Sequence, residues 1–412
     1  MQSKSSQPNS SVFSIPVLVA ALGYFVDIYD LQLFNIIGKE SLEKGLHLPP
    51  DQIARYDYLL FLWQMGGMLL GGIVFGILGD KLGRKSVLFS SILIYSLANI
   101  ANAFVTDITQ YQVVRLIAGF GLSGELGAAI TLISEIIDKE RRGWGTMIIV
   151  SAGALGAVAG NLIAKQTAWQ MSYIIGGVLG LVLLAFRVGT FESGMFDRLK
   201  SHTVQKGNFF MLFKSKTIFL KYLACILIGL PVWFVIGILI KFSGKYAALL
   251  HINEPISVGD SIMYAYIGLS VGDLLSGWMS QVWRSRRKVV FMYLIFTLLL
   301  NIAYLYLRFL CAAAFYFLTF VLGLATGFWA LFVSIASEQF GTNIRATVTT
   351  TVPNFVRGAV IPITLSFNYL LEHFGIEMAT WVVGGTCILL SGISTWSLSE
   401  TFAKDLDYYE TS

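Results

Sequence analysis

The sequence predicts an all-α membrane protein in which twelve transmembrane helices form two pseudo-symmetric six-helix bundles. The 412 residues are 56% hydrophobic and only 13% charged, and their mean hydropathy is +0.71. A soluble domain of this size would be far less apolar. Twelve apolar stretches are long enough to cross a bilayer, and features of the first half of the chain recur in the second half.

A bilayer core needs about 20 apolar residues per helix. Stretches of this length are expected at residues 12–38, 56–79, 86–106, 109–137, 145–165, 170–189, 219–241, 258–282, 288–307, 310–336, 347–371 and 376–397. The longest polar interruption follows the sixth stretch. We therefore expect an N-terminal bundle in residues 1–189, a cytoplasmic linker at 190–218, and a C-terminal bundle with a short cytoplasmic tail in residues 219–412.

Basic residues predict the orientation in the membrane. The connections after the even-numbered helices carry Lys81, Arg84, Lys85, Lys139, Arg141, Arg142, Arg284, Arg286, Arg287, Lys288 and Arg345. Because positive loops stay in the cytoplasm, both termini are expected there. The net charge of +5 then reflects membrane topology and not nucleic-acid binding. We expect a monomer, surrounded by lipid, in a bacterial cytoplasmic (inner) membrane.

An internal repeat supports the division into two bundles. A shift of 201 residues places Gly76 on Gly277, and a shift of 203 residues places Ser134-Glu135 on Ser337-Glu338 and Arg142 on Arg345. Transporters built from such repeats bind their substrate between the repeats, near the middle of the membrane. The sequence therefore predicts a central site between two bundles.

Two motifs carry a family resemblance. The loop Asp80-Lys81-Leu82-Gly83-Arg84-Lys85 follows a glycine-rich helix and resembles the signature loop of the major facilitator superfamily. The fourth helix, with Arg115, Gly119, Gly121, Gly124 and Glu125, and the following Glu135 and Arg141-Arg142-Gly143, is similar to the metabolite:proton symporter branch. That branch is related to sugar and phosphate porters. The resemblance implies the major facilitator fold and transport by alternating access.

A group of charged residues at helix ends is expected to act as a conformational latch. The resemblance implies that Asp80 contacts the N-terminus of the eleventh helix, here near Thr347, where unsatisfied amides favour an anion. By resemblance, Asp80, Arg84, Glu135 and Arg142 form the latch, and the repeat adds Glu338 and Arg345. The alternative is that these charges only orient the loops, which would explain the basic residues but neither Asp80 nor Glu135.

A few ionisable residues lie well inside predicted helices, where they are costly and usually face a cavity or a partner. They are Asp27, Asp30, Arg115, Glu125, Asp273 and Arg357. Asp27 and Asp30 are three residues apart and share a helical face, at a depth similar to that of Arg115. We expect an ion pair between Arg115 and one of these aspartates.

This ion pair suggests how protons could be coupled to transport. Substrate that competes for Arg115 would release Asp27 or Asp30, which would then bind or lose a proton. The alternative is a static pair that holds helices one and four together. Glu125 is a rival proton carrier, because it lies among the small residues Gly121, Gly124 and Gly127.

Arg357 is the expected anchor for an anionic substrate. It lies about 15 Å into the eleventh helix, one turn from Asn354, and its guanidinium group suits a carboxylate or a phosphate. Pairing with Asp273 or with helix-end carbonyls is the alternative. The complete set of expected substrate-binding residues is Tyr29, Gln64, Arg115, Trp233, Trp329, Asn354 and Arg357.

The function expected from these features is transport and not catalysis. The sequence has no nucleotide-binding loop, no metal-ligand cluster and no catalytic nucleophile arrangement, so we expect no enzyme activity, cofactor or metal. Helix five lacks the Gly-Pro pair common in exporters of the resembled superfamily, since Ala157 follows Gly156. We expect proton-coupled uptake of a small polar metabolite, foremost a carboxylate-bearing organic anion. The alternatives are an exporter of siderophores or drug-like compounds and a non-transporting nutrient sensor.

Overall fold

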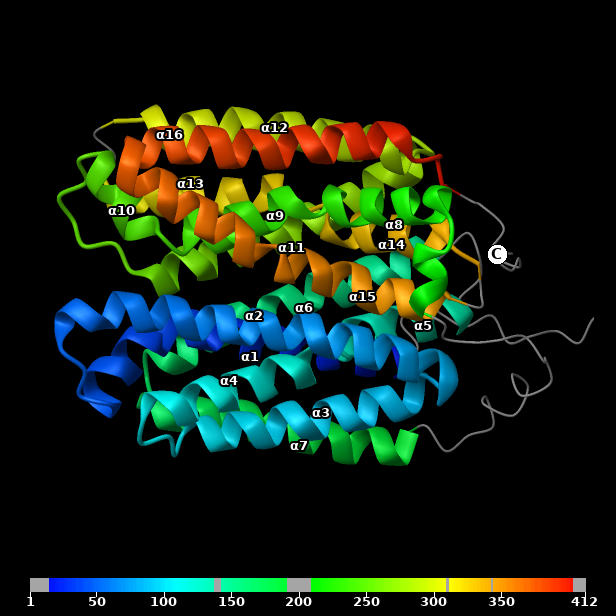
Figure 1. The fold of residues 1–412 in the computed structure, drawn as a ribbon, viewed down its shortest axis with the longest axis horizontal. Coiled ribbons are helices and arrows are strands. Elements are labelled where there is room, and N and C mark those ends of the chain that lie inside the picture. The colour runs from blue at the N-terminus through cyan, green and yellow to red at the C-terminus, as the bar shows by residue number, and fades with distance from the viewer. Residues whose placement is uncertain (1–14, 137–141, 191–208, 309–310, 342–343, 403–412) are drawn as a thin grey trace, which may run out of the picture.

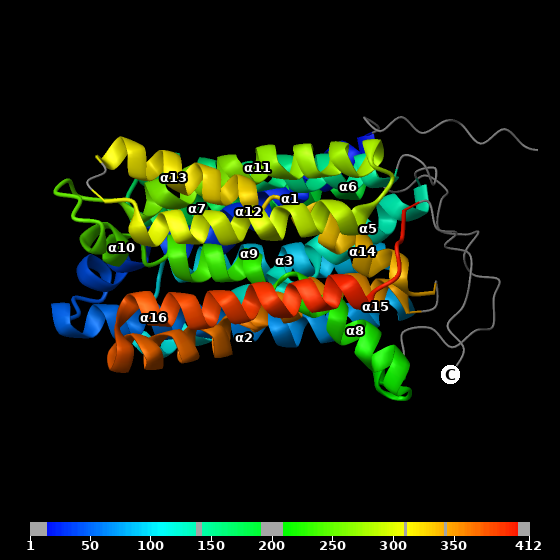
Figure 2. The same ribbon diagram turned by 90° about the horizontal axis from the view of Figure 1, so that it is seen from above.

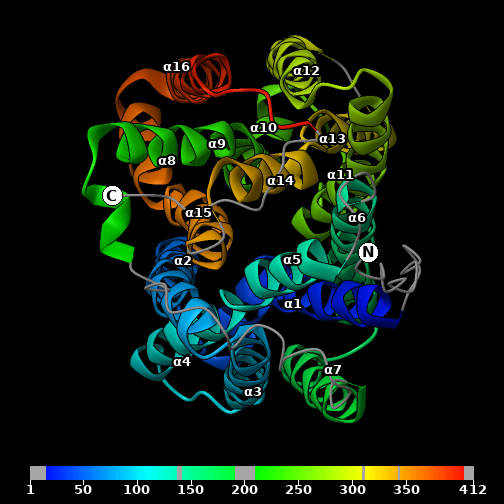
Figure 3. The ribbon, with the colours of Figure 1, turned by 90° about the vertical axis from the view of Figure 1, so that its right-hand side faces the viewer.

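The computed structural model describes residues 15–136, 142–190, 209–308, 311–341 and 344–402, and within these ranges every regular element is helical. In Figure 3, which looks along the helices, the blue and cyan helices of the first half lie below the green, yellow and red helices of the second half. The interface between the halves is made mainly by α2 against α15 and by α6 against α11.

The first half, residues 15–190, contains α1 (Ile15–Glu40), the π-helical turn η1 (Ser41–Gly45), α2 (Pro50–Lys81), α3 (Arg84–Asn102), α4 (Ile108–Leu122), α5 (Glu125–Ile136), α6 (Arg142–Ala164) and α7 (Trp169–Thr190). These helices run side by side along the long axis of the molecule (Figure 1).

The second half, residues 209–402, contains the 3-10 helix η3 (Phe209–Phe213), α8 (Lys216–Ile228), α9 (Leu230–Phe234), the π-helical segment η4 (Val235–Ile240), α10 (Ser243–Leu249), α11 (Val258–Val282), α12 (Arg286–Tyr306), α13 (Ala312–Ala325), α14 (Trp329–Gln339), α15 (Arg345–Gly358) and α16 (Val360–Ser397).

Within the described ranges, the chain crosses the bundle twelve times. Nine helical stretches within the described residues are long and apolar enough to span a membrane. Two further long helices run beside them, α3 against α4 and α7, and α11 against α6 and α13. The last of the nine stretches, Thr347–Ser397, contains two crossings, because Gly375 has a φ of 81° that reverses the chain direction. The predicted all-α fold of twelve helices is confirmed.

An even number of crossings places the start of α1 and the end of α16 at one end of the molecule, the right-hand end in Figures 1 and 2. We call this the terminal end, and the opposite end, which contains α10, the distal end. Residues 191–208, most of the expected linker, lie outside the described residues.

Close backbone contacts between helices repeat in the two halves. Gly67 of α2 lies against the α4 backbone, and Gly268 of α11, 201 residues later, lies against the α13 backbone. A side chain at either position would collide with a carbonyl of the neighbouring helix. The two contacts are therefore related by the same shift of 201 residues as the repeat in the sequence.

The predicted fourth and tenth helices are each broken, which the apolar pattern did not indicate. α4 gives way to α5 at Ser123 and Gly124, and α13 gives way to α14 at Thr326 to Phe328. Gly327 packs directly on the backbone of Gly272, so the tight contact leaves no room for a side chain there. The matched breaks expose backbone groups at the middle of each half.

Gly66 and Gly67 provide a direct test of the backbone contact. Changing Gly67 to Ala should destabilise the protein by roughly 1 to 3 kcal/mol, because α2 and α4 must separate. Gly66 has nothing within 4 Å of its missing side chain, so Gly66→Ala should be neutral or slightly stabilising, since alanine favours helices. Thermal unfolding of the purified variants in detergent measures both effects. Equal melting temperatures would contradict the packing argument.

Candidate functional site

A small cavity lies between the two halves, at the middle of the molecule. The first half contributes residues of α1 and α6, and the second half contributes residues of α9, η4, α11, α14 and α15. Its lining is Tyr24, Ile28, Val150, Ala154, Val232, Trp233, Ile236, Tyr266, Leu269, Trp329 and Arg357. The centre of a water-sized sphere can occupy only about 20 Å³ of it, which is room for about one water molecule. A metabolite would need the halves to move apart.

Arg357 is the only cationic residue of the cavity lining, and its acidic neighbour comes from the other half. Its Nη2 atom lies 3.8 Å from Oδ2 of Asp27 on α1, and both side chains are fully buried. The guanidinium also donates to Oδ1 of Asn354 at 3.3 Å and to the hydroxyl of Tyr24 at 3.5 Å. Neither Asp27 oxygen receives a hydrogen bond from the described residues. The pair is therefore long and weakly supported.

Asp273 has a structural role and is not the partner of Arg357. One of its oxygens accepts the backbone N–H of Ala330 at 2.9 Å, at the start of α14. An aspartate at a helix N-terminus satisfies free amides and interacts well with the helix dipole. The break between α13 and α14 therefore explains the buried Asp273, and the alternative pairing with Arg357 is wrong.

Two tryptophans make the cavity aromatic, as expected from the sequence. The rings of Trp233 and Trp329 meet edge to face at a centroid distance of 6.4 Å, and the Arg357 guanidinium lies 5.9 Å from the Trp329 ring centroid. The indole N–H of Trp329 is buried and has no hydrogen-bond acceptor among the described residues. The cavity thus offers flat apolar walls, one guanidinium and one unused donor.

The expected ion pair between Arg115 and an aspartate is wrong. Arg115 donates to the side chain of Gln64 and lies over the Phe34 ring, 4.5 Å from its centroid. No carboxylate of the described residues lies within ion-pair distance of it. The reason is that Gly119 lets the α2 backbone approach α4 at Gln64. Gln64 and Arg115 are therefore joined inside the first half and do not line the cavity.

Tyr29 and Asp30 also face the interior of the first half. The Tyr29 hydroxyl donates to the backbone carbonyl of Ser172 on α7 at 2.9 Å. Asp30 lies against Gly176, also on α7. Although Asp27 and Asp30 are only three residues apart, Asp27 faces the second half and Asp30 faces α7. Tyr29 is not a cavity residue.

Asn354 makes a contact between the halves beside the cavity. Its amide donates to the backbone carbonyl of Ser123 at 2.7 Å. That carbonyl is available because α4 ends at this point. Asn354 thus links Arg357 to the break between α4 and α5.

Glu125 is held by a partner that the sequence analysis missed. Its carboxylate forms a bidentate ion pair with Arg187 of α7, at 2.5 and 2.9 Å, and both side chains are fully buried. Arg187 stands three residues before the end of α7. Basic residues are common near helix ends, and it was therefore overlooked. Its position inside the predicted sixth helix was the available signal.

At the distal end, two ion pairs join the halves. Lys241, after η4, lies 3.0 Å from Asp57 of α2 and donates to Asn35 of α1 at 2.9 Å. Asp260 of α11 pairs with Lys165, the residue after α6. These residues close the distal end of the interface, and the sequence analysis did not identify them.

At the terminal end, Asp80 makes the expected contact with the eleventh helix. Its Oδ2 atom accepts the backbone N–H of Thr347 at 2.8 Å and the Thr347 hydroxyl at 2.5 Å. The interface is therefore closed at both ends. For the other latch residues in the first half, Arg84, Glu135 and Arg142, the structure describes the helical backbone but not the side chains.

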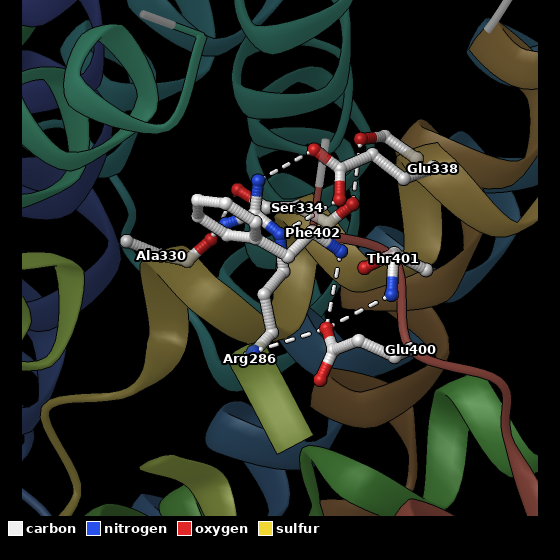
Figure 4. A network of polar contacts seen from close by, with 8 residues as sticks. Arg286, Ala330, Ser334, Glu338, Glu400, Thr401 and Phe402 are labelled. Carbon is white, nitrogen blue, oxygen red and sulfur yellow. Dashed lines mark hydrogen bonds and ion pairs between the residues drawn. The ribbon is translucent and has the colours of Figure 1, made fainter. Parts of the chain in front are cut away.

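In the second half, Glu338 pairs with Arg286 at the start of α12, at 2.6 and 2.7 Å (Figure 4). Arg286 is the 201-residue counterpart of Lys85. Arg345, the other latch residue predicted here, is buried at the start of α15.

Glu400, which follows α16, caps the N-terminus of α12. Its carboxylate accepts the hydroxyl of Ser285 at 2.5 Å and the backbone N–H groups of Arg286 at 3.0 Å and Arg287 at 3.3 Å (Figure 4). Partial burial raises the pKa of Glu400, but these hydrogen bonds outweigh it and lower the pKa below its ordinary value. The last described segment is thus tied to the terminal end of α12.

Residues 20–364 match the family model of the Major Facilitator Superfamily. The chain belongs to this superfamily. It is 26% identical over 401 residues to a Bacillus subtilis (strain 168) protein provisionally named as the niacin/nicotinamide transporter NiaP, covering 92% of this chain and 95% of the relative. It is 25% identical over 398 residues to a Cupriavidus pinatubonensis (strain JMP 134 / LMG 1197) protein provisionally named as a 4-methylmuconolactone transporter, covering 91% and 87%.

The proton:xylose symporter XylE, solved with 6-bromo-6-deoxy-D-glucose, has the same fold, with a TM-score of 0.73 at 17% identity over 97% of this chain and 98% of that one. As a major facilitator protein, this chain is an integral membrane transporter and not an enzyme.

The ion pair of Glu125 and Arg187 gives a stability test. Changing Glu125 to Gln should cost about 3 to 5 kcal/mol, because Arg187 is left as an unpaired buried charge. The double change Glu125→Leu and Arg187→Met should restore most of that loss. Glu40→Gln, which breaks the exposed pair with Lys44, is the matched control and should cost about 0 to 1 kcal/mol. Thermal unfolding in detergent measures all three, and equal losses for Glu125→Gln and Glu40→Gln would contradict the assignment.

Glu400 gives a pH test. Because its pKa is lowered in the folded protein, its charged form stabilises the fold above the ordinary pKa of a glutamate, and this contribution disappears as the pH falls through the folded pKa. Glu400→Gln should therefore lower the melting temperature at pH 7 but not in strongly acidic buffer. A difference that stays constant over this pH range would exclude the charge as the cause.

Proposed function

We propose that this protein takes up a small carboxylate-bearing organic anion together with a proton by alternating access. The observation that carries the proposal is the ion pair between Asp27 and Arg357. It joins the two halves at the central cavity, and it is long and weakly hydrogen-bonded. Because it lies on the interface, the charge state of the pair affects both binding and the relative position of the halves.

Protonation of Asp27 and binding of an anion would support each other. While Asp27 is charged, it neutralises Arg357 and competes with any carboxylate. Once Asp27 accepts a proton, the guanidinium is an uncompensated buried charge, which is costly until an anion arrives. A substrate carboxylate can then take the bidentate geometry that guanidinium groups prefer. The proton carrier is thus Asp27 with Arg357, in place of the expected pair with Arg115.

The chemistry of the relatives' named substrates agrees with this proposal. Niacin and 4-methylmuconolactone are both small ring compounds that carry a carboxyl group. Nicotinamide, which the name of the Bacillus subtilis relative also gives, has the same ring as niacin with an amide in place of the carboxyl group. Trp233, Trp329 and Tyr266 supply flat walls beside Arg357, and such surfaces suit a planar ring. Once the halves move apart, these walls would suit a ring-bearing monocarboxylate better than a sugar or an extended tricarboxylate.

Basic residues indicate which end of the protein faces the cytoplasm. Basic residues gather at the terminal end, which we assign to the cytoplasm, and residues 190–218 then form a cytoplasmic linker. Asp80 with Thr347 at the terminal end, and Lys241 with Asp57 at the distal end, would open in turn as the halves rock. The proposed setting is a monomer in a bacterial inner membrane, with protons driving uptake.

Arg357 can be tested with nicotinate as the probe. Nicotinate at millimolar concentration should raise the melting temperature of the purified protein, because a ligand that prefers the folded state stabilises it. Arg357→Ala should abolish this shift. Arg115→Gln, at a buried arginine outside the cavity, is the control and should keep it. Stabilisation by xylose in place of nicotinate, or loss with Arg115→Gln alone, would contradict the site.

Asp27 can be tested by separating exchange from accumulation. Asp27→Asn imitates the protonated residue, so proteoliposomes should still exchange labelled nicotinate across the membrane at equal pH. They should no longer concentrate it under an imposed pH gradient, because the proton site is lost. Accumulation by Asp27→Asn at the wild-type level would exclude Asp27 as the carrier.

A further inference from the structure

Helix α3 carries a buried polar face that the central site does not use. The residues of this face are Ser91, Tyr95, Ser96, Asn99 and Asn102, and their spacing places them on one side of the helix. All five are 0% exposed. None of their side-chain oxygen or nitrogen atoms has a hydrogen-bond partner among the described residues. We call this set the α3 polar face.

The α3 polar face lies inside the first half and away from lipid. Ser96 packs against Gly177 and Gly180 of α7, while Tyr95 packs against Gly121 of α4. Asp30 of α1 lies beside the middle of the face, where its carboxyl group and the Asn99 amide approach each other without reaching the geometry of a direct hydrogen bond. Both Asp30 oxygens are also buried without a hydrogen-bond donor from the described residues. A carboxyl group, two amides and three hydroxyl groups therefore share one interior region.

Stability alone does not explain these residues. A buried polar group without a partner loses its hydration and gains nothing in return, so apolar side chains at the same positions would be more favourable. The third helix of the second half, α12, shows the usual solution. There Tyr293 donates to the carbonyl of Gly272 at 2.9 Å, Thr297 to that of Ala325 at 2.9 Å, and Tyr304 to that of Leu239 at 3.0 Å. The polar face of α3 has no such contacts.

We propose that the α3 polar face binds a row of hydrogen-bonded water molecules through which protons reach Asp30. Buried waters need two to four polar partners each, and hydroxyl and amide groups can both donate and accept. From Ser91 to Asn102 the row covers about 16 Å, and Asn102 is the last residue of α3, at the distal end.

The charged and titratable groups around Asp30 place it on a path to the central site. Asp27 is one turn away on α1, Arg115 approaches from α4, and Tyr173 approaches from α7. Tyr95 of the polar face is also within the electrostatic reach of the Glu125 and Arg187 pair. A proton that arrives at Asp30 can therefore pass to Asp27, while the substrate enters between the halves. This inference rests on the proposed proton coupling.

The first experiment measures proton access without transport. Infrared difference spectra against Asp30→Asn identify the band of the protonated Asp30 carboxyl group, and a change to D₂O then shifts that band as the proton exchanges. The double change Ser96→Ala and Asn99→Leu should slow this exchange by about tenfold or more, because it interrupts the chain of donors and acceptors. Thr297→Val in α12 is the matched control and should leave the exchange rate unchanged. Exchange at the wild-type rate in the double variant would overturn the proposal, as would the absence of an exchanging Asp30 band.

A second experiment separates this proposal from the proposed function. In proteoliposomes with an internal pH dye, nicotinate should drive proton uptake by the wild type, and the double variant should show about tenfold slower uptake with unchanged nicotinate exchange at equal pH. Its melting temperature should not fall, because the residues lost make no internal hydrogen bonds. A lower melting temperature, or unchanged proton uptake, would overturn the water row. If the wild type took up no protons with nicotinate, the proposed proton coupling would be overturned. Slowed deuterium exchange at Asp30 in the double variant would then still support the row of water molecules.

Discussion

The cost of a charge inside a membrane protein determines how the rest of this structure can work. Each buried ionisable group must find compensation, and the source of that compensation limits what the group can do. Glu125 and Arg187 lie in the same half and are joined by two short hydrogen bonds, so they are suited to hold α5 against α7. Asp27 and Arg357 come from different halves and approach only to 3.8 Å. Only the second pair can respond to both a ligand and a movement of the halves.

Polar contacts join the two halves at both ends of the interface, and the cavity between these ends is small. Lys241 and Asp260 bind across the distal end, and Asp80 binds across the terminal end. Between them, the cavity has space for about one water molecule. Alternating access needs the two ends to open at different times, and here each end has its own polar contacts.

Sequence patterns predicted the parts of this structure that depend on one helix at a time. The twelve crossings and the repeat follow from apolar length and glycine spacing. The contact of Asp80 with the eleventh helix was implied by the family resemblance, and helix-end chemistry gives its physical reason. The partners of Arg115 and Asp30 did not follow, because spacing identifies a helical face but not the neighbour that packs on it. Gly119 brings Gln64 to Arg115, and no local pattern near Arg115 indicates that approach. Arg187 and Lys241 were missed because they stand near helix ends, where a charge is ordinary.

The glycine contacts of α2 with α4 and of α11 with α13 bring helix backbones together in each half without intervening side chains. Two backbones in direct contact have no rotamers to adjust, so neither helix pair can slide or bend easily under load. A displacement at the cavity is then transmitted along these helix pairs to both ends of the bundle. A relative movement of the halves would therefore displace α2 together with α4, and α11 together with α13, with little deformation inside either pair.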